Sequence, residues 1–277
     1  MEVHSPSNGF SAHLNHLPRI PIRTPIELLD RLHSFYADRN IEKFRNELDS
    51  LPTGTHPRCF DIHDLDTLMI DAIRRDDPQF TMELLHRGLP LDPDYVLEAA
   101  KSRARSVLEM FFNEGWDINK PISEVNRRCL DPNQQCAIDL TPLSHAVKYA
   151  PVSIIRLLLR HGGNVQQGQL LFHALDRKSE IIAVLQLLLR EGASIDATMY
   201  QNHYASWRLY YFMGLGTVLH KAAELGNVEA VQFLLNEGID LSIQDANGRT
   251  ALECAEMLNK VEVVEVLKEA ARPKINH

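Results

Sequence analysis

The residues best suited to chemistry in this sequence are acids, histidines and a cluster of aromatic side chains. Asp176 and Glu224 are acids that would serve as general acid and base if the fold brought them together. Their spacing follows no catalytic pattern, and the sequence has no glycine-rich phosphate loop, no His-Glu-x-x-His helix and no Gly-x-Ser-x-Gly elbow. We therefore predict no catalytic residues and no cofactor.

Possible metal ligands are scattered along the chain. A structural zinc site usually brings two close pairs of ligands together. The four cysteines form no Cys-x-x-Cys pair, and they are Cys59, Cys129, Cys136 and Cys254. His145 and His173 would need further ligands that the sequence does not supply nearby. We predict no metal site, and free thiols in a reducing compartment.

Residues 197–216 contain the strongest candidate for a binding surface. Tyr200, Tyr204, Trp207 and Tyr211 follow i, i+4, i+7, i+11 spacing, so a helix would align them on one face. Tyrosine and tryptophan give large contact areas with a polar group, which is typical of hot spots in protein interfaces. The alternative is a lid that packs on neighbouring segments and shields apolar surface. One helix can do both, so both interpretations stay open.

A repeated unit must position these residues, because alanine and glycine recur at a fixed interval. The interval is 16 residues in Ala72–Gly88, Ala99–Gly115, Ala146–Gly162 and Ala222–Gly238, and 18 in Ala174–Gly192. Alanine lets two helices approach closely, and glycine suits the left-handed residue that ends a helix. Each unit is therefore predicted to be a helix–turn–helix in an all-α fold. The longer interval predicts two additional residues in one turn, around 177–180.

One segment carries the pattern of a known family. The residues from Thr217 to Asn227 read Thr-Val-Leu-His-Lys-Ala-Ala-Glu-Leu-Gly-Asn, which resembles the ankyrin-repeat signature Thr-Pro-Leu-His-x-Ala-Ala-x-x-Gly-His/Asn. Thr141-Pro142-Leu143, followed by Leu157 to Gly162, gives a second match. The resemblance implies a solenoid of about six helix-turn-helix units with degenerate repeats in the N-terminal half. It also implies that Thr217 and His220 are a structural pair that anchors a turn.

The repeat positions predict the organisation of the chain. Tails are expected at 1–24 and 273–277, and the first is rich in Pro, Ser, Asn and His, which is typical of disorder. The repeat region at 25–272 is expected to hold units at about 25–51, 66–93, 94–119, 141–167, 168–196 and 217–249, and a cap at 250–272. Two long insertions, 120–140 and 197–216, are expected beside the concave surface. The first reads as an irregular loop.

In the family that this chain resembles, residues flanking the reference alanines line the concave recognition face. The resemblance therefore implies partner contacts for His145, Lys148, His173, Asp176, Lys221 and Glu224. The equivalent positions in the other units are Asp71, Arg74, Glu98, Lys101, Cys254 and Met257. Their mixed charges favour polar and specific contacts.

Charge and hydropathy restrict the class of partner. A formal net charge of −8 and a pI near 5.9 argue against nucleic acid and anionic membranes. The sequence shows no secretory signal and no apolar stretch long enough to span a bilayer, so we expect a cytoplasmic protein, with a nuclear location as the alternative.

We predict a monomeric, non-enzymatic protein-interaction module that holds a protein or peptide on its concave face and insertion loops. The alternative is an enzyme or small-molecule binder with a pocket between the insertion 197–216 and the groove of the central repeats. A third possibility is that the chain is the recognition part of a larger assembly.

Overall fold

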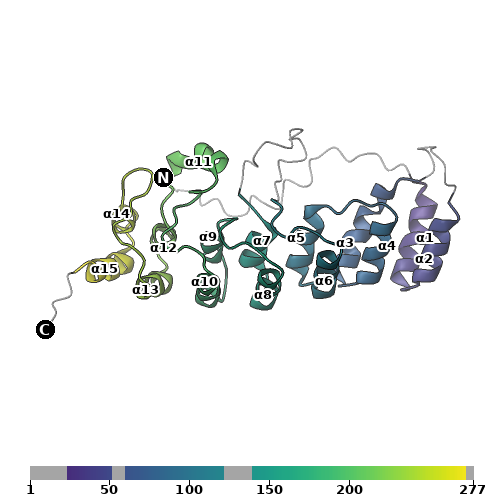
Figure 1. Ribbon diagram of the computed structural model, residues 1–277, viewed down its shortest axis with the longest axis horizontal. Helices are drawn as coiled ribbons and strands as arrows, with labels where there is room; N and C mark the ends of the chain where they lie inside the picture. The colour runs from purple at the N-terminus through teal and green to yellow at the C-terminus, as the bar shows by residue number, and fades with distance from the viewer. Residues whose placement is uncertain (1–23, 52–59, 122–138, 273–277) are drawn as a thin grey trace, which may run out of the picture. The chain divides into compact units, whose positions relative to one another are not determined.

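The computed structural model describes residues 24–51, 60–121 and 139–272 (Figure 1). Within these ranges the regular secondary structure is helical, apart from one isolated bridge between Thr198 and Thr217. The prediction of an all-α repeat fold is confirmed. Most of both predicted tails, most of the first insertion, and Cys59, Cys129 and Cys136 lie outside the described residues.

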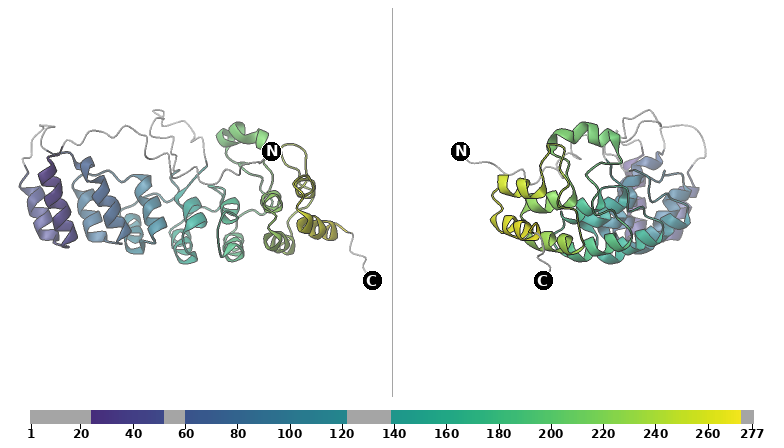
Figure 2. Two further views of the ribbon diagram at one scale, coloured as in Figure 1. Left: turned by 180° about the vertical axis from the view of Figure 1, so that it is seen from behind. Right: turned by 60° about the vertical axis from the view of Figure 1, so that its left-hand side comes forward.

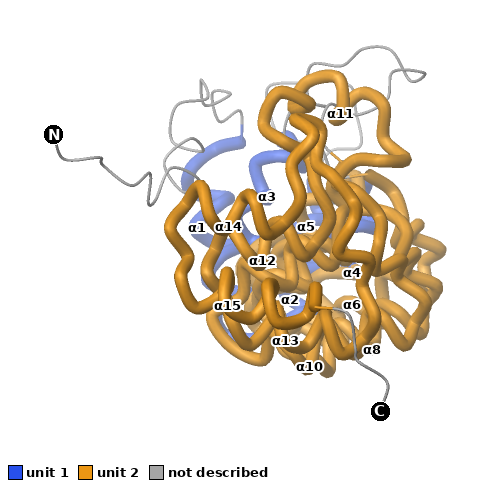
Figure 3. Tube along the Cα trace, turned by 90° about the vertical axis from the view of Figure 1, so that its left-hand side faces the viewer, with its two compact units in different colours: residues 1–68, 83–89 blue, residues 69–82, 90–277 orange. Residues whose placement is uncertain are grey.

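The chain divides into two compact units, coloured separately in Figure 3. Unit 1 comprises residues 1–68 and 83–89, and unit 2 comprises residues 69–82 and 90–277. Helices α3 (Asp66–Arg74) and α4 (Pro78–His86) contribute residues to both.

Unit 1 is built around a small helical core. Its own elements are α1 (Ile26–Ala37), α2 (Ile41–Asp49) and the 3₁₀ helix η2 (Ile62–Leu65). Leu32 and Phe44 are completely buried between α1 and α2. The buried carboxylate of Glu83 accepts hydrogen bonds from Arg45 (2.6 Å) and Arg87 (2.8 Å). Against the effect of burial, these two bonds hold the pKa of Glu83 below its ordinary value.

Thr24 belongs to unit 1 rather than to a tail. Its side chain is buried, its backbone N–H donates to Asp64 (2.8 Å), and its hydroxyl accepts from the backbone N–H of Asp61 (2.9 Å). The sequence assigned this residue to the disordered tail. That prediction is wrong at Thr24, because these bonds fix the residue against the segment that holds η2.

Unit 2 contains two rows of helices, which Figures 1 and 2 show side by side. The first row is α5 (Pro93–Ser102), α7 (Pro142–Tyr149), α9 (Leu170–Ala174), α12 (Val218–Leu225) and α14 (Ala251–Met257). The second row is α6 (Arg105–Asn113), α8 (Val152–Arg160), α10 (Ile181–Arg190), α13 (Val228–Asn236) and α15 (Val261–Ala270). Helix α11 (Tyr204–Tyr210) and the 3₁₀ helix η4 (Tyr211–Met213) lie beyond the first row.

The repeated alanines and leucines form the core of unit 2. The reference alanines at 99, 146, 174, 222 and 255 are completely buried, where a methyl group lets first-row helices such as α5 and α7, or α12 and α14, pack closely. Second-row helices bury Leu158, Leu188 and Leu234 completely. Gly162 has φ +90°, the left-handed conformation that ends α8 without strain.

The longer turn between α9 and α10 contains Arg177, which joins two adjacent repeats. Its buried guanidinium donates to the backbone carbonyls of Val147 and Ala150, the latter at 2.9 Å. These carbonyls lie at the end of α7, where a helix leaves its last acceptors without intrahelical partners. The additional residues of this turn therefore allow a side chain to cap the preceding repeat.

Candidate functional site

The polar residues predicted on the recognition face lie along the first row of unit 2. His145 and Lys148 are on α7, His173 is on α9, Asp176 follows α9, and Lys221 and Glu224 are on α12. Thr141 begins α7 by accepting a hydrogen bond from the backbone N–H of Ser144, and Pro142 occupies the first helical position. The cap sets the residue at which α7 begins, and this start determines which of its side chains point to the recognition face.

Asp176 is the electrostatic centre of this face. Its carboxylate lies 2.7 Å from Lys221 Nζ, 3.7 Å from Lys148 Nζ and 3.6 Å from His173 Nδ1. Burial alone would raise the pKa of Asp176, but the contacts with His173 and the two lysines hold it well below its ordinary value. The structure therefore brings three of the other predicted residues together around the Asp176 carboxylate.

The two histidines of this face are only partly paired. His145 Nδ1 is buried and has no hydrogen-bond partner among the described residues, and its ring stacks on Tyr149 with centroids 6.0 Å apart. Burial and the positive charges of Lys101 and Lys148 lower the pKa of His145 to about 3. His145 is therefore neutral near pH 7. The 3.6 Å contact of His173 with Asp176 is too long for a hydrogen bond.

Lys221 and Glu224 mark the α12 end of the face. Lys221 Nζ also donates to the backbone carbonyl of Phe172 (2.8 Å), so this lysine bridges α12 and α9. Glu224 is half-buried, and burial raises the pKa of its carboxyl group above the ordinary value. The two predicted acids, Asp176 and Glu224, therefore have pKa values shifted in opposite directions.

The aromatic residues of the second insertion form two groups rather than one row. Trp207 stacks between Tyr204 and Tyr211, with ring centroids 6.4 and 5.7 Å apart. Tyr200 lies before α11 with φ +61° and instead contacts Tyr210 at 5.7 Å. The prediction that Tyr200 shares the helix face is wrong, because the left-handed turn at Tyr200 lies outside α11, which begins four residues later. Burial raises the pKa of Tyr200 to about 12.

Three polar residues that sequence reasoning missed fasten this insertion to the repeats. The buried hydroxyl of Ser206 accepts from the backbone N–H of Asp139 (3.1 Å). The carboxylate of Asp139 in turn accepts from Gly168 N (3.1 Å) and Gln169 Nε2 (2.6 Å). Gln169 Oε1 accepts from the backbone N–H of Tyr200 (3.0 Å). This chain of bonds joins the end of the first insertion to the second.

Above these anchors, six large apolar side chains are exposed. We call this surface the aromatic shelf, and its residues are Tyr204, Trp207, Leu209, Tyr211, Phe212 and Met213. Tyr204 is 66% exposed and Phe212 is 65% exposed. Such a concentration of exposed apolar side chains is typical of an interaction site.

Thr217 and His220 begin the repeat that follows the shelf. His220 Nδ1 accepts from the backbone N–H of Thr217 (3.0 Å), so the ring proton is on Nε2, which donates to the carbonyl of Arg249 (3.0 Å). Burial lowers the pKa of His220, in agreement with a neutral ring. In the repeat at 141, Ser144 makes the corresponding contact with the carbonyl of Gly168 (2.7 Å).

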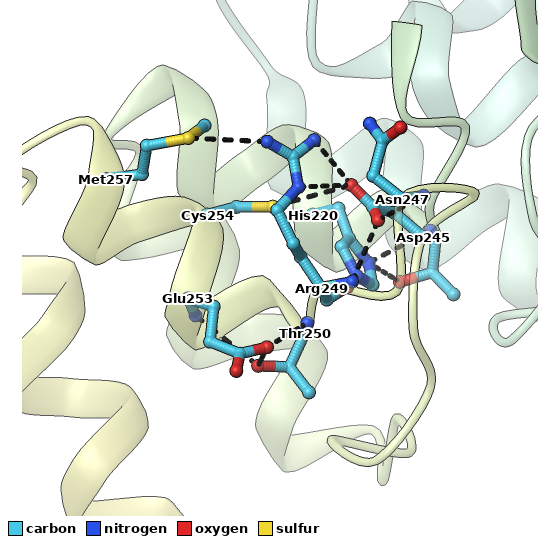
Figure 4. A network of polar contacts seen from close by, with 9 residues as sticks. His220, Asp245, Asn247, Arg249, Thr250, Glu253, Cys254 and Met257 are labelled. Atoms are coloured by element: carbon cyan, nitrogen blue, oxygen red, sulfur yellow. Dashed lines mark hydrogen bonds and ion pairs between the residues drawn. The ribbon is translucent and has the colours of Figure 1, made fainter. Parts of the chain in front are cut away.

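An ion pair between the buried Asp245 and the partly exposed Arg249 completes this end of unit 2 (Figure 4). The Asp245 carboxylate accepts from Arg249 Nε (2.9 Å) and Nη2 (2.6 Å). A Cβ atom on Gly214 would lie 2.5 Å from Arg249 Nη2, so only glycine fits where the second insertion ends. Cys254 was predicted on the exposed face, but it is completely buried against Asp245, and burial raises the pKa of its thiol to about 11. That prediction is wrong.

A shallow depression lies between α9 and the start of the second insertion. Its polar lining includes Gln166, Gln169, Gln201 and Asn202, and its apolar lining includes Phe172. None of the residues that line it is titratable. Within the described ranges, no three His, Cys, Asp or Glu side chains gather as they would around a metal ion, and no helix is long and apolar enough to cross a membrane.

Comparison with known proteins gives one consistent result. A family model described as ankyrin repeats, in three copies, matches residues 205–277. The ankyrin repeat protein nuc-2 of Neurospora crassa is 30% identical over 139 residues, 49% of this chain and 12% of that protein. The ankyrin repeat and SOCS box protein 11 of Danio rerio is 29% identical over 118 residues, 41% of this chain and 35% of that protein. The chain thus matches only a minor part of each relative.

Proposed function

We propose that this chain, whose residues 205–277 match the ankyrin-repeat family model, is a non-enzymatic module that binds a protein or peptide through the aromatic shelf and the first-row face of unit 2. Ankyrin repeats are in general protein–protein interaction modules. A rigid stack of helices holds the recognition side chains in place before the partner arrives, which lowers the entropy lost on binding.

The observation that carries this proposal is the aromatic shelf. Trp207, flanked by two tyrosines, is 42% exposed, although Ser206 next to it is completely buried and anchored to Asp139. The helix is therefore fixed by one face while its aromatic face is left open. Aromatic side chains held in this way lose little conformational entropy when they bury against a partner.

The pocket alternative has less support. The depression beside α9 is lined by amide, hydroxyl and apolar groups, so it supplies no acid, base or nucleophile with a shifted pKa. The acids Asp176 and Glu224 do not line it. A protein partner remains the better proposal. The cytoplasmic location and the monomeric state stay predictions from the sequence.

The test is capture of partners from native lysate by three forms of the full chain. These are the wild type, a Tyr204→Ala/Trp207→Ala variant, and an Ile26→Ala control that removes a comparably exposed apolar side chain from unit 1. Surface substitutions should change stability by only about 0.5 kcal/mol, which urea denaturation checks for each form. We expect a protein captured by the wild type and the control to be reduced about ten-fold or more with the shelf variant.

Two outcomes would contradict the proposal. One is equal capture of the same proteins by the wild type and the folded shelf variant. The other is a small molecule that co-purifies with the wild type and raises its melting temperature, with no protein captured. The second outcome would favour the pocket alternative.

A further inference from the structure

Three lysines and two histidines lie along the middle of the first row of unit 2. We call this segment the basic row, and it consists of Lys101 on α5, His145 and Lys148 on α7, His173 on α9 and Lys221 on α12. It runs through the middle of a unit in a chain whose formal net charge is −8. Glu98 and Glu224 lie on the same face, but Glu98 is paired with Arg74, and neither forms an ion pair with a lysine of the row among the described residues.

A single carboxylate serves the three lysines of the row. Asp176 binds Lys221 directly, but it lies 3.7 Å from Lys148, too far for a good hydrogen bond. Lys101 is exposed and makes no ion pair within the described residues. By contrast, Arg74 at the neighbouring position towards the N-terminus is paired with Glu98 at 2.7 Å. Lysines without a close carboxylate partner are thus confined to α5 and α7.

An apolar contact surface lies beside these free donors. Tyr149 is 53% exposed, and Lys148 Nζ lies 5.3 Å from the centre of its ring. The ring of His145 stacks on Tyr149, and its buried Nδ1 atom has no hydrogen-bond partner in the described residues. The same short stretch of α7 therefore offers a cation, a neutral imidazole and an aromatic ring.

We propose that the basic row binds an acidic peptide segment of a protein partner. Carboxylates of that segment pair with Lys101 and Lys148, and an apolar residue between them packs on Tyr149. The inference rests on the proposed function, because it names the chemistry of the partner that the module holds. The complementary charges would determine specificity and association rate more than total affinity.

The small number of incompletely paired lysines favours a peptide over a nucleic acid as the ligand. Two incompletely paired lysines match two carboxylates, whereas nucleic-acid binding needs a larger basic surface that offsets phosphate repulsion. The net charge of −8 would repel a phosphate backbone along the rest of the surface.

Fluorescence anisotropy with labelled synthetic probes tests the inference. The probes are a twelve-residue peptide of repeating Asp-Leu-Glu, the same peptide with lysine replacing each acid, and a single-stranded DNA of equal length. The full chain is compared with Lys101→Gln/Lys148→Gln and with Lys120→Gln/Lys178→Gln, a control pair of exposed lysines outside the row. We expect the acidic peptide to bind the wild type and the control equally, and the row variant about ten-fold more weakly.

A variant that gains affinity is also needed, because a variant can weaken binding merely by unfolding. Asp176→Asn removes the one carboxylate that competes for the lysines, so it should tighten binding of the acidic peptide, and added salt should weaken that binding.

Three results would overturn the inference: no binding of the acidic peptide, equal weakening by the row and control variants, or tighter binding of the DNA. If the shelf-dependent partner is still captured from lysate in any of these cases, only the acidic-segment inference fails. Loss of that partner's dependence on the shelf would instead contradict the proposed function.

Discussion

The basic row and the aromatic shelf belong to the same unit, but the contacts that hold their side chains in place are arranged in opposite ways. In the row, the group that holds the surface together is also part of the surface, since Asp176 contacts Lys148, His173 and Lys221. In the shelf, anchoring and exposure are separate. Ser206 is buried and bonded to Asp139, while Trp207 on the same helix faces solvent.

This difference predicts how mutations act on the two surfaces. A substitution at Asp176 changes both folding and recognition, because its carboxylate contacts Lys148, His173 and Lys221 inside the protein. A substitution of an exposed shelf residue changes recognition alone. Stability measurements can therefore separate the two surfaces even before a partner is known.

The largest expected loss of stability follows from removing the Asp176 carboxylate at the centre of the basic row. In Asp176→Ala, Lys221 loses its 2.7 Å partner, and Lys148 and His173 lose the carboxylate that lies 3.7 Å and 3.6 Å from them. We expect urea denaturation to show a loss of about 2 kcal/mol in the free energy of unfolding. Asp240→Ala, at an exposed acid outside the row, should cost much less. Equal losses in the two variants would show that Asp176 is not the centre of the row.

A smaller effect should appear as a pH dependence that comes from His145. Its pKa in the folded chain is about 3, below the ordinary value of 6.5, so the unfolded chain binds a proton more readily at mildly acidic pH. The contribution of this pKa difference to the free energy of unfolding is fully present above pH 6.5 and is lost as the pH falls towards 3. Between pH 7 and pH 5 we expect a loss of about 1–2 kcal/mol.

The His145→Gln variant isolates this contribution. It should lose less stability than the wild type over the same pH range, because glutamine does not titrate. The matched variant His86→Gln, at an exposed histidine on α4, should follow the wild type. A wild-type pH profile in His145→Gln would assign the dependence to other groups.

The smallest effect should come from loosening the anchor of the shelf. Asp139→Ala removes the bonds to Gly168 N and Gln169 Nε2, at an expected cost of about 1 kcal/mol. In a Trp116→Phe background, where Trp207 is the one remaining tryptophan, acrylamide should quench its fluorescence more strongly after the change. Asp240→Ala serves again as the control. Unchanged quenching in Asp139→Ala would mean that the shelf is held by other contacts.

Features with a short repeat in the sequence were predictable. The alanine and glycine interval identified the buried alanines of the first-row helices, because close helix packing demands a small side chain at the same place in each unit. The two-residue excess around 177–180 matched the longer turn that contains Arg177. The spacing of Tyr204, Trp207 and Tyr211 likewise gave their stacking.

Features that depend on long-range contacts or on local backbone conformation were not predictable. The bond between Asp139 and Ser206 joins residues 67 positions apart, and no local pattern marks either partner. Tyr200 fits the helical spacing, but its φ of +61° removes it from the helix. Ser144 offered a usable signal, because it follows Thr141 at the interval that separates His220 from Thr217.

The anchor at Asp139 also determines whether the shelf can be transplanted. A protein engineer who moved residues 197–216 alone into another repeat scaffold would leave behind Asp139 and Gln169, which bind Ser206 and Tyr200. The graft would keep its aromatic composition but lose the bonds that orient it. The smallest portable cassette therefore includes Asp139 and Gln169 as well as Arg249, against which the glycine at 214 fits.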